Sequence, residues 1–322
     1  MNPRLTIIVP VYNASRYIER CVTSLMRQSL RNGVEFLFVD DGSTDASVAL
    51  IEKTLKAYPD RAGQVRIVRN ATNQGVYLTR KCGIEEAKGT YIGWCDSDDR
   101  VDSDYYQKLL DATQDGAMDI VVCDYTNIRE EGESVCHFDI QHTPQDCIEQ
   151  NYRINSLPME LYVQLFKRDI IRQAFDMIYP TGVGEDTYSV IFAYVLSKSI
   201  AYVHNAGYYY DRRVETSIMN TQGHDMQDWL PHQYNLERIA QTLYALPDGK
   251  NRFHRTVNSM KYWRKLGYKQ AFATEREFYY TFRECYKDIN VISHTPNKLR
   301  WLVYLLYNYY PLYRLGKMLK VM

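Results

Sequence analysis

Short β-branched segments alternate with segments of helical period through the N-terminal part of the chain, and this alternation constrains the fold more than any other feature. Strands are expected at residues 5–9, 34–39, 65–68 and 91–95. Helices are expected between them at residues 14–29, 45–57 and 73–86. Because such alternation joins parallel strands by right-handed crossovers, the sequence predicts an α/β fold with a mostly parallel central sheet flanked by helices.

Polar clusters follow three of these strands, immediately after Val9, Val39 and Cys95. In an open parallel sheet the ligand lies outside the carboxyl ends of the strands, so the clusters are expected to meet at one edge. Two of the clusters are acidic and would repel each other unless they served different parts of one ligand. A nucleotide diphosphate with its metal ion offers two such parts.

The most acidic of these clusters is the segment Asp96-Ser97-Asp98-Asp99. Its three carboxylates suit a hard cation such as Mg²⁺ or Mn²⁺ that is shared with a substrate phosphate. An alternative is that Asp99 or Asp102 only caps a helix that begins near Ser103.

Composition excludes several other classes of protein. Lysine plus arginine and aspartate plus glutamate number 39 each, so no net charge draws the chain to nucleic acid. The seven cysteines contain no Cys-x-x-Cys pair, so neither a zinc site nor a disulfide framework is expected. With no signal peptide and no run of about 18 uncharged apolar residues, we expect a cytoplasmic protein without a membrane-spanning helix.

The pattern is less regular beyond residue 102. A helix is expected at 103–114 and a strand at 118–123, antiparallel strands are possible within 127–146, and 161–175 is helical or mixed. A glycine-rich loop, Thr181 to Asp186, leads into a helix at 187–196, and two short strands follow at 200–203 and 208–210. The chain is helical from about residue 227, so we predict a catalytic domain at 1–220 (halves 1–102 and 103–220) and a helical region at 221–322.

Five motifs, taken together, resemble the family 2 inverting nucleotide-sugar glycosyltransferases. The motifs occur in the family's order, over residues 4–218: Val9-Pro10-Val11-Tyr12-Asn13, Asp40-Asp41-Gly42-Ser43-Thr44-Asp45, Asn73-Gln74-Gly75 with Arg80 and Gly83-Ile84, Asp96-Ser97-Asp98-Asp99, and Glu185-Asp186. The resemblance implies the GT-A fold, with a Rossmann-like sheet. One departure is that Thr79-Arg80-Lys81-Cys82 stands where relatives often have Ala-Arg-Asn.

The resemblance also implies roles for individual residues. The expected nucleotide-binding residues are Pro10, Tyr12, Asp41, Arg80, Asp96 and Arg213. The expected ligands of a divalent ion, Mn²⁺ or Mg²⁺, are Asp96 and Asp98, although the family's variation leaves Asp99 as an alternative to Asp98. Asp186 is the expected catalytic base, which would deprotonate an acceptor hydroxyl so that a UDP-sugar with an α-linkage yields a β-linked product.

Each of these roles has a structural alternative. Asp40 and Asp45 could cap a helix, Tyr12 could belong to the core, and the loop at 73–75 could be a simple helix entry. Glu185-Asp186 could interact with a helix dipole, and Arg212-Arg213 could be a solvated pair. His204 is either an additional metal or phosphate ligand or a surface residue at a strand end.

The function expected from the resemblance is sugar transfer to a cell-surface glycan or a lipid-linked oligosaccharide. A nucleotidyltransferase and an inactive sugar-nucleotide-binding module on the same scaffold are the alternatives. Residues 298–322 are aromatic and basic, so they either pack on the catalytic domain or lie peripherally on the inner face of the membrane, which we favour by analogy.

Overall fold

A computed structural model describes residues 2–181, 184–213, 226–267, 274–288 and 308. The chain divides into two compact units, which are described separately. Unit 1 contains Met1–Pro144 and Leu157–Thr221, and unit 2 contains Gln145–Ser156 and Gln222–Met322.

The described residues of unit 1 form a nine-stranded sheet in the order β3-β2-β1-β4-β8-β6-β9-β5, with β7 paired to β6. The strands are β1 (Leu5–Val11), β2 (Val34–Asp40), β3 (Val65–Arg69), β4 (Tyr91–Trp94), β5 (Arg100–Val101), β6 (Ile120–Arg129), β7 (Gly132–Cys136), β8 (Gln164–Lys167) and β9 (Ile200–Asp211). Strands β1 to β4 pair in parallel, whereas β8 pairs antiparallel with both β4 and β6. The prediction of an α/β fold is confirmed; β1 to β4 form a parallel N-terminal part, and β6 and β9 also pair in parallel.

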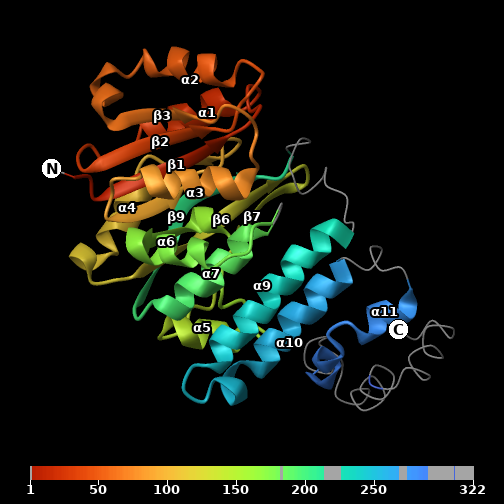
Figure 1. Cartoon of the computed structure of the whole chain (residues 1–322). Coiled ribbons are helices and arrows are strands. Elements are labelled where there is room, and N and C mark those ends of the chain that lie inside the picture. Colours follow the sequence, from red (N-terminus) through yellow and green to blue (C-terminus); the bar gives the residue numbers. More distant parts are fainter. Residues whose placement is uncertain (1, 182–183, 214–225, 268–273, 289–307, 309–322) are drawn as a thin grey trace. The chain divides into compact units, whose positions relative to one another are not determined.

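Helices flank this sheet in unit 1. They are α1 (Ile18–Met26), α2 (Ser47–Leu55), α3 (Val76–Glu86), α4 (Tyr105–Asp111), α6 (Arg168–Asp176) and α7 (Glu185–Leu196). Figure 1 shows α1 beside α2, and α3, α6 and α7 following one another along the sheet. The helix α3 approaches the sheet closely because Gly83 has no side chain: a Cβ atom there would lie 2.6 Å from Ile8 Cγ2 and 3.3 Å from Val39 Cγ2.

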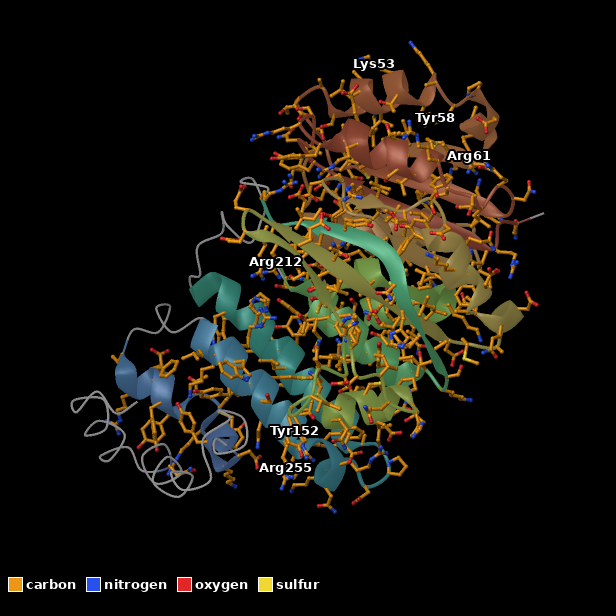
Figure 2. The ribbon with its side chains drawn as sticks, turned by 180° about the vertical axis from the view of Figure 1, so that it is seen from behind. Lys53, Tyr58, Arg61, Tyr152, Arg212 and Arg255 are labelled. Atoms are coloured by element: carbon orange, nitrogen blue, oxygen red, sulfur yellow. The ribbon has the colours of Figure 1, made fainter. Side chains whose placement is uncertain are left out.

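The core of unit 1 forms around the central strands β1 and β2. Ile7 and Ile8 of β1 and Phe36 to Phe38 of β2 are fully buried, as expected for strands covered on both faces. Arg61, labelled in Figure 2, is 1% exposed and its guanidinium donates to the main-chain oxygens of Met26 and Leu30. These bonds satisfy carbonyl groups at and beyond the C-terminal end of α1.

The structure defines three elements more closely than the sequence prediction did. The strand expected at 118–123 continues to Arg129 and forms a hairpin with β7, which supports the antiparallel alternative for that region. Residues 161–175 contain β8 followed by α6. The two strands expected at 200–203 and 208–210 are one strand, β9, interrupted by an irregularity opposite Asp124.

Unit 2 contains most of α5 (Pro144–Gln150), together with α9 (Met226–Tyr244), α10 (Gly249–Gly267) and α11 (Glu275–Tyr280). The guanidinium of Arg255 lies 5.7 Å from the ring centroid of Tyr152, and the two side chains are labelled together in Figure 2. Among the described residues, no helix has the length and apolar character needed to cross a bilayer. The segment 298–322 lies outside the described residues except for Asn308.

Candidate active site

The carboxyl ends of β1, β2 and β4 lie at one edge of the sheet. In the parallel register Val11 is opposite Asp40 and Ile8 is opposite Trp94. The main-chain N–H of Asp41 donates to Val11 O at 2.8 Å, which continues this pairing beyond the end of β2. The polar residues that follow the three strands are therefore close together in space, as the strand order requires.

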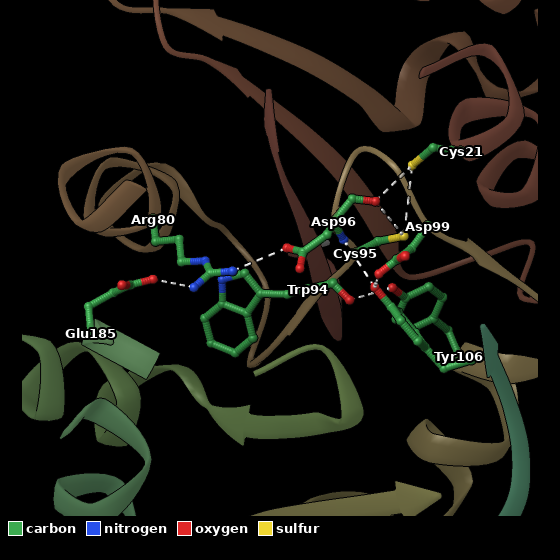
Figure 3. Close-up of polar contacts among 9 residues, drawn as sticks. Cys21, Arg80, Trp94, Cys95, Asp96, Asp99, Tyr106 and Glu185 are labelled. Atoms are coloured by element: carbon green, nitrogen blue, oxygen red, sulfur yellow. Dashed lines mark hydrogen bonds and ion pairs between the residues drawn. The ribbon is translucent and has the colours of Figure 1, made fainter. Parts of the chain in front are cut away.

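Arg80 of α3 connects this edge to the start of α7. Its side chain is buried, and Nη2 lies 3.1 Å from Asp96 Oδ1 while Nη1 donates to Glu185 Oε1. Figure 3 shows the guanidinium between these two carboxylates. Asp186 follows Glu185 directly, so the Arg80 pairings bring the Glu185-Asp186 motif to the same region as Asp96.

Burial and neighbouring charges shift the pKa values of both Arg80 and Glu185. Burial lowers the pKa of the guanidinium, but Glu185 and Asp96 outweigh that effect and raise it above its ordinary value. Burial raises the pKa of Glu185 to about 7, because the attraction of Arg80 is opposed by the negative charge of Asp186. The Nε atom of Arg80 is also buried and has no hydrogen-bond partner among the described residues.

Asp186 lies in the first turn of α7, after Gly184, whose φ of 77° is left-handed. Its Oδ1 accepts a hydrogen bond from the main-chain N–H of Thr187 at 2.7 Å. Its Oδ2 takes no hydrogen bond from the part of the chain that the structure describes, and the side chain is half-buried. This oxygen can therefore accept a proton from a ligand hydroxyl.

The two candidate metal ligands Asp98 and Asp99 have different environments. Asp99 is fully buried, with its oxygens accepting hydrogen bonds from Tyr208 OH at 2.6 Å and from Asp211 N at 3.0 Å. Asp98 is only half-buried, and no described lysine or arginine forms an ion pair with its carboxylate. Burial, together with the charge of Asp96, raises the pKa of Asp98 to about 6.

The two carboxylates differ in hydrogen bonding more than in pKa, because burial and the charges of Asp98 and Asp96 also raise the pKa of Asp99 well above its ordinary value. Both oxygens of Asp99 accept hydrogen bonds, so Asp98 with Asp96 offers the more accessible pair of oxygen ligands for a divalent ion. The helix-cap alternative is not supported, because α4 begins after Asp104 without a side-chain capping bond. Asp102 instead accepts a hydrogen bond from Tyr209 OH at 3.3 Å.

Two of the expected nucleotide-binding residues, Asp41 and Tyr12, differ in their exposure to solvent. Asp41 is 3% exposed, and its carboxylate accepts from Asn70 Nδ2 at 2.8 Å and from the N–H groups of Gln74 and Gly75 at 3.0 and 2.9 Å. Asp41 therefore fastens the 73–75 loop. The side chain of Tyr12 is 49% exposed, so it is not a core residue and is open to stacking by a ligand ring.

The remaining sequence candidates lie at the ends of β1 and β9. Pro10 is a half-buried residue of β1. Arg213 pairs with both oxygens of Asp211, with Nε and Nη2 each at 2.8 Å, and the same carboxylate pairs with Arg20 Nη1 of α1 at 2.9 Å. The hydrogen bonds from Arg213 and Arg20 hold the pKa of Asp211 far below its ordinary value despite burial.

The sequence prediction did not include Glu160, which lies near the candidate base. Burial raises its pKa, with a further contribution from the charge of Asp186, and Tyr125 OH donates to its Oε1 at 3.2 Å. Neither the spacing of Glu160 nor its neighbours in sequence indicates a site, because Pro158-Met159-Glu160 resembles an ordinary loop. The folded chain alone brings it close to Asp186.

Comparison with known proteins agrees with this architecture. Residues 6–160 match the model of glycosyl transferase family 2. The chain is 39% identical over 125 residues to the glycosyltransferase EpsJ of Bacillus subtilis (strain 168), covering 39% of this chain and 35% of EpsJ. It is 29% identical over 227 residues to the putative glycosyltransferase EpsH of the same organism, covering 68% of this chain and 64% of EpsH. The chain therefore spans less than two thirds of the length of either relative.

A solved structure supports the fold over a longer range. The structure of S. aureus TarS 1–349 in complex with UDP-GlcNAc has a TM-score of 0.72 and 18% identity, covering 97% of this chain and 92% of that one. At this identity the likeness concerns the fold alone, which is the expected GT-A fold. The chain is therefore similar to glycosyl transferase family 2 over residues 6–160 and similar to TarS in its fold.

Proposed function

We propose that the protein is a metal-dependent, inverting glycosyltransferase that moves a sugar from a nucleotide-sugar to an acceptor hydroxyl. One observation carries the proposal. The guanidinium of Arg80 contacts Asp96, at the end of β4, and Glu185, which is the residue before Asp186. This links the residues assigned to the donor with the residue assigned as the base, as a direct displacement requires.

On this proposal the donor binds at the carboxyl ends of β1, β2 and β4. Exposed Tyr12 lies against the base and Asp41 holds the loop around it, with Pro10 at the end of β1. The favoured nucleotide is UDP, and Arg213 is placed on the diphosphate, for which guanidinium geometry is suited. A divalent ion bound by Asp96 and Asp98 supplies charge stabilisation for the leaving diphosphate.

Asp186 is the proposed general base. Its Oδ2 takes the proton of the acceptor hydroxyl while the hydroxyl oxygen bonds to the anomeric carbon, and the bond from that carbon to the diphosphate breaks. A single displacement inverts the anomeric centre, so an α-linked donor gives a β-linked product. We further propose that the acceptor is a cell-surface glycan or lipid-linked oligosaccharide, met at the cytoplasmic face of the membrane.

A panel of donors tests this function. UDP-Glc, UDP-Gal, UDP-GlcNAc, UDP-GalNAc and GDP-Man are incubated with the full chain and Mn²⁺, and release of nucleoside diphosphate is measured with and without oligosaccharide acceptors. Asp186→Asn should bind the donor but lose at least about 100-fold in turnover, as expected for removal of a general base. Asp169→Asn is the matched control, because that carboxylate is 82% exposed on α6.

Three results would contradict the proposal. Turnover of the Asp186→Asn variant close to that of the Asp169→Asn control would remove the base. Release of pyrophosphate from a nucleoside triphosphate and a sugar phosphate would indicate a nucleotidyltransferase. Tight binding of a donor without turnover for any acceptor would indicate an inactive binding module.

A further inference from the structure

We propose that Asp124, His137 and His204 form a second metal site that binds a divalent transition metal of the zinc type. Asp124 belongs to β6, His137 follows the end of β7, and His204 belongs to β9. One ligand atom from each of the three side chains lies within 4.8 Å of those of the other two. All three residues belong to unit 1, so the cluster is formed within one compact unit.

The ligand chemistry fits this class of ion. Two imidazoles with one carboxylate are typical of Zn²⁺ and related transition metals, whereas Mg²⁺ prefers oxygen atoms alone. The cysteine spacing that argued against zinc has no bearing on this site, because it contains no thiolate. Its three ligands are also separated in the sequence by 13 and 67 residues, since 137 − 124 = 13 and 204 − 137 = 67.

The two distances from the carboxylate to the imidazoles are close to those of tetrahedral coordination. Asp124 Oδ2 lies 3.0 Å from His137 Nδ1 and 3.6 Å from His204 Nδ1. Ligand atoms of a tetrahedral zinc ion at ordinary bond lengths lie about 3.3–3.6 Å from one another. An ion can therefore enter with small side-chain rotations, and the 62% and 72% exposure of the two histidine side chains leaves room for those rotations and for water as a further ligand.

The carboxylate is held in position by its neighbours. Tyr202 OH donates to Asp124 Oδ1, and Tyr202 OH itself accepts from the N–H of Phe138 at 3.0 Å. This leaves Oδ2, on the side of the histidines, with one main-chain donor, Asn205 N at 3.2 Å. Partners of this kind orient the ligands of metal sites and raise their affinity.

The backbone of β9 is shaped around the same carboxylate. Val203 is opposite Cys123 and Tyr208 is opposite Tyr125, so four residues of β9 face Asp124 alone. Bulges re-aim side chains and are common beside functional sites. Here the bulge allows His204 to reach Oδ2, while the N–H of Asn205 bonds to the same oxygen.

Hydrogen bonds alone are the competing explanation for the cluster. Asp124 is 1% exposed, and no described lysine or arginine forms an ion pair with it. Burying a carboxylate is costly unless a cation or hydrogen bonds compensate its charge. A bound divalent ion would compensate the carboxylate and use both imidazoles as ligands.

This site is separate from the carboxylates assigned to the sugar donor. The side chain of Cys123 contacts Tyr105 OH at 3.4 Å, and the ring of Tyr105 lies 5.7 Å from that of Tyr208, the partner of Asp99. Neighbouring residues of a strand point to opposite faces, so Asp124 points away from the face where Tyr208 meets Asp99. Loss of one metal site should therefore leave the other intact.

Zinc binding to the full chain tests the proposal. Metal is removed with a chelator, and Zn²⁺ is titrated in competition with a chromophoric chelator, while Co²⁺ reports ligand geometry through its visible absorption. We expect one zinc ion bound per chain in Asp98→Asn, which lacks the donor ion's ligand. In the same Asp98→Asn background, the double variant His137→Ala, His204→Ala should lose at least about 100-fold in zinc affinity, since changing only the residues that orient metal ligands already costs about 10–100-fold.

The controls distinguish this site from adventitious binding. His254→Ala removes a histidine of unit 2 that is 41% exposed and lies 3.8 Å from Asp288, so it should keep the zinc affinity of the unaltered chain. Zn²⁺ should raise the melting temperature of that control and leave that of the double variant unchanged. Equal zinc affinity in the double variant and the control, or no bound zinc in Asp98→Asn, would overturn the proposal.

Discussion

Replacing Arg80 with methionine tests the central ion pair of the candidate site. The change removes the buried cation between Asp96 and Glu185 and keeps most of the side-chain volume. Removing one partner of a buried pair costs about 3–5 kcal/mol, because it leaves an uncompensated charge in the interior. Arg31→Met is the matched control: Arg31 pairs with Asp60 at the surface, where such pairs contribute about 0–1 kcal/mol.

The structure also predicts how this loss depends on pH. The pKa of Glu185 is raised from 4.5 to about 7, so the folded chain binds more protons than the unfolded chain in this window. Stability from this group is present below pH 4.5 and is lost as the pH rises through about 7, a change of about 3 kcal/mol. Without Arg80 the pKa of Glu185 should rise further, so the variant should lose most stability at pH 8 and less at pH 5.5.

Chemical denaturation of the full chain at these two pH values measures the effect. The double variant Arg80→Met, Glu185→Gln should recover part of the stability at pH 8, because glutamine has no charge to compensate. The reasoning is refuted if Arg80→Met costs no more than Arg31→Met, or if the second substitution restores nothing.

Two further predictions concern the acidic motif and the packing of α3. Asp98→Asn should abolish Mn²⁺-dependent binding of UDP, measured by calorimetry with and without Mn²⁺, with little change in melting temperature. Asp99→Asn should instead cost about 1–3 kcal/mol of stability, measured by thermal unfolding. Equal melting temperatures for the two variants would contradict the assignment. Gly83→Ala should cost about 1–3 kcal/mol because its Cβ would lie 2.6 Å from Ile8 Cγ2, while Gly63→Ala, with nothing within 4 Å, should be within about 0.5 kcal/mol of the unaltered chain. Similar unfolding midpoints for these glycine variants would show that α3 moves to accommodate the methyl group.

Local pattern was sufficient for the N-terminal half of the sheet. Strands β1 to β4 are short, apolar and separated by helical segments, so their order and direction follow from periodicity and from the handedness of crossovers. The edge at which the polar clusters meet follows from the same rule. The C-terminal half was harder, because β8 and α6 join without a break and β6 pairs with strands from three parts of the chain.

Roles that depend on burial could not be read from the motifs. Asp98 and Asp99 are adjacent and chemically identical, yet residues of β9 give hydrogen bonds to the buried carboxylate of Asp99, while Asp98 is only half-buried. Glu160 carries no local signal and is near Asp186 only in the folded chain.

The amino-acid sequence by itself determined the alternation of strands and helices, and therefore the edge where Asp41 and Asp96 lie. Tertiary structure decided which charges are compensated, because compensation depends on partners from distant segments. Arg80 finds Glu185 across 105 residues, and Asp124 meets His204 across a bulge in β9. Such contacts arise from strand pairing and burial, which act through space and leave no periodic trace along the chain.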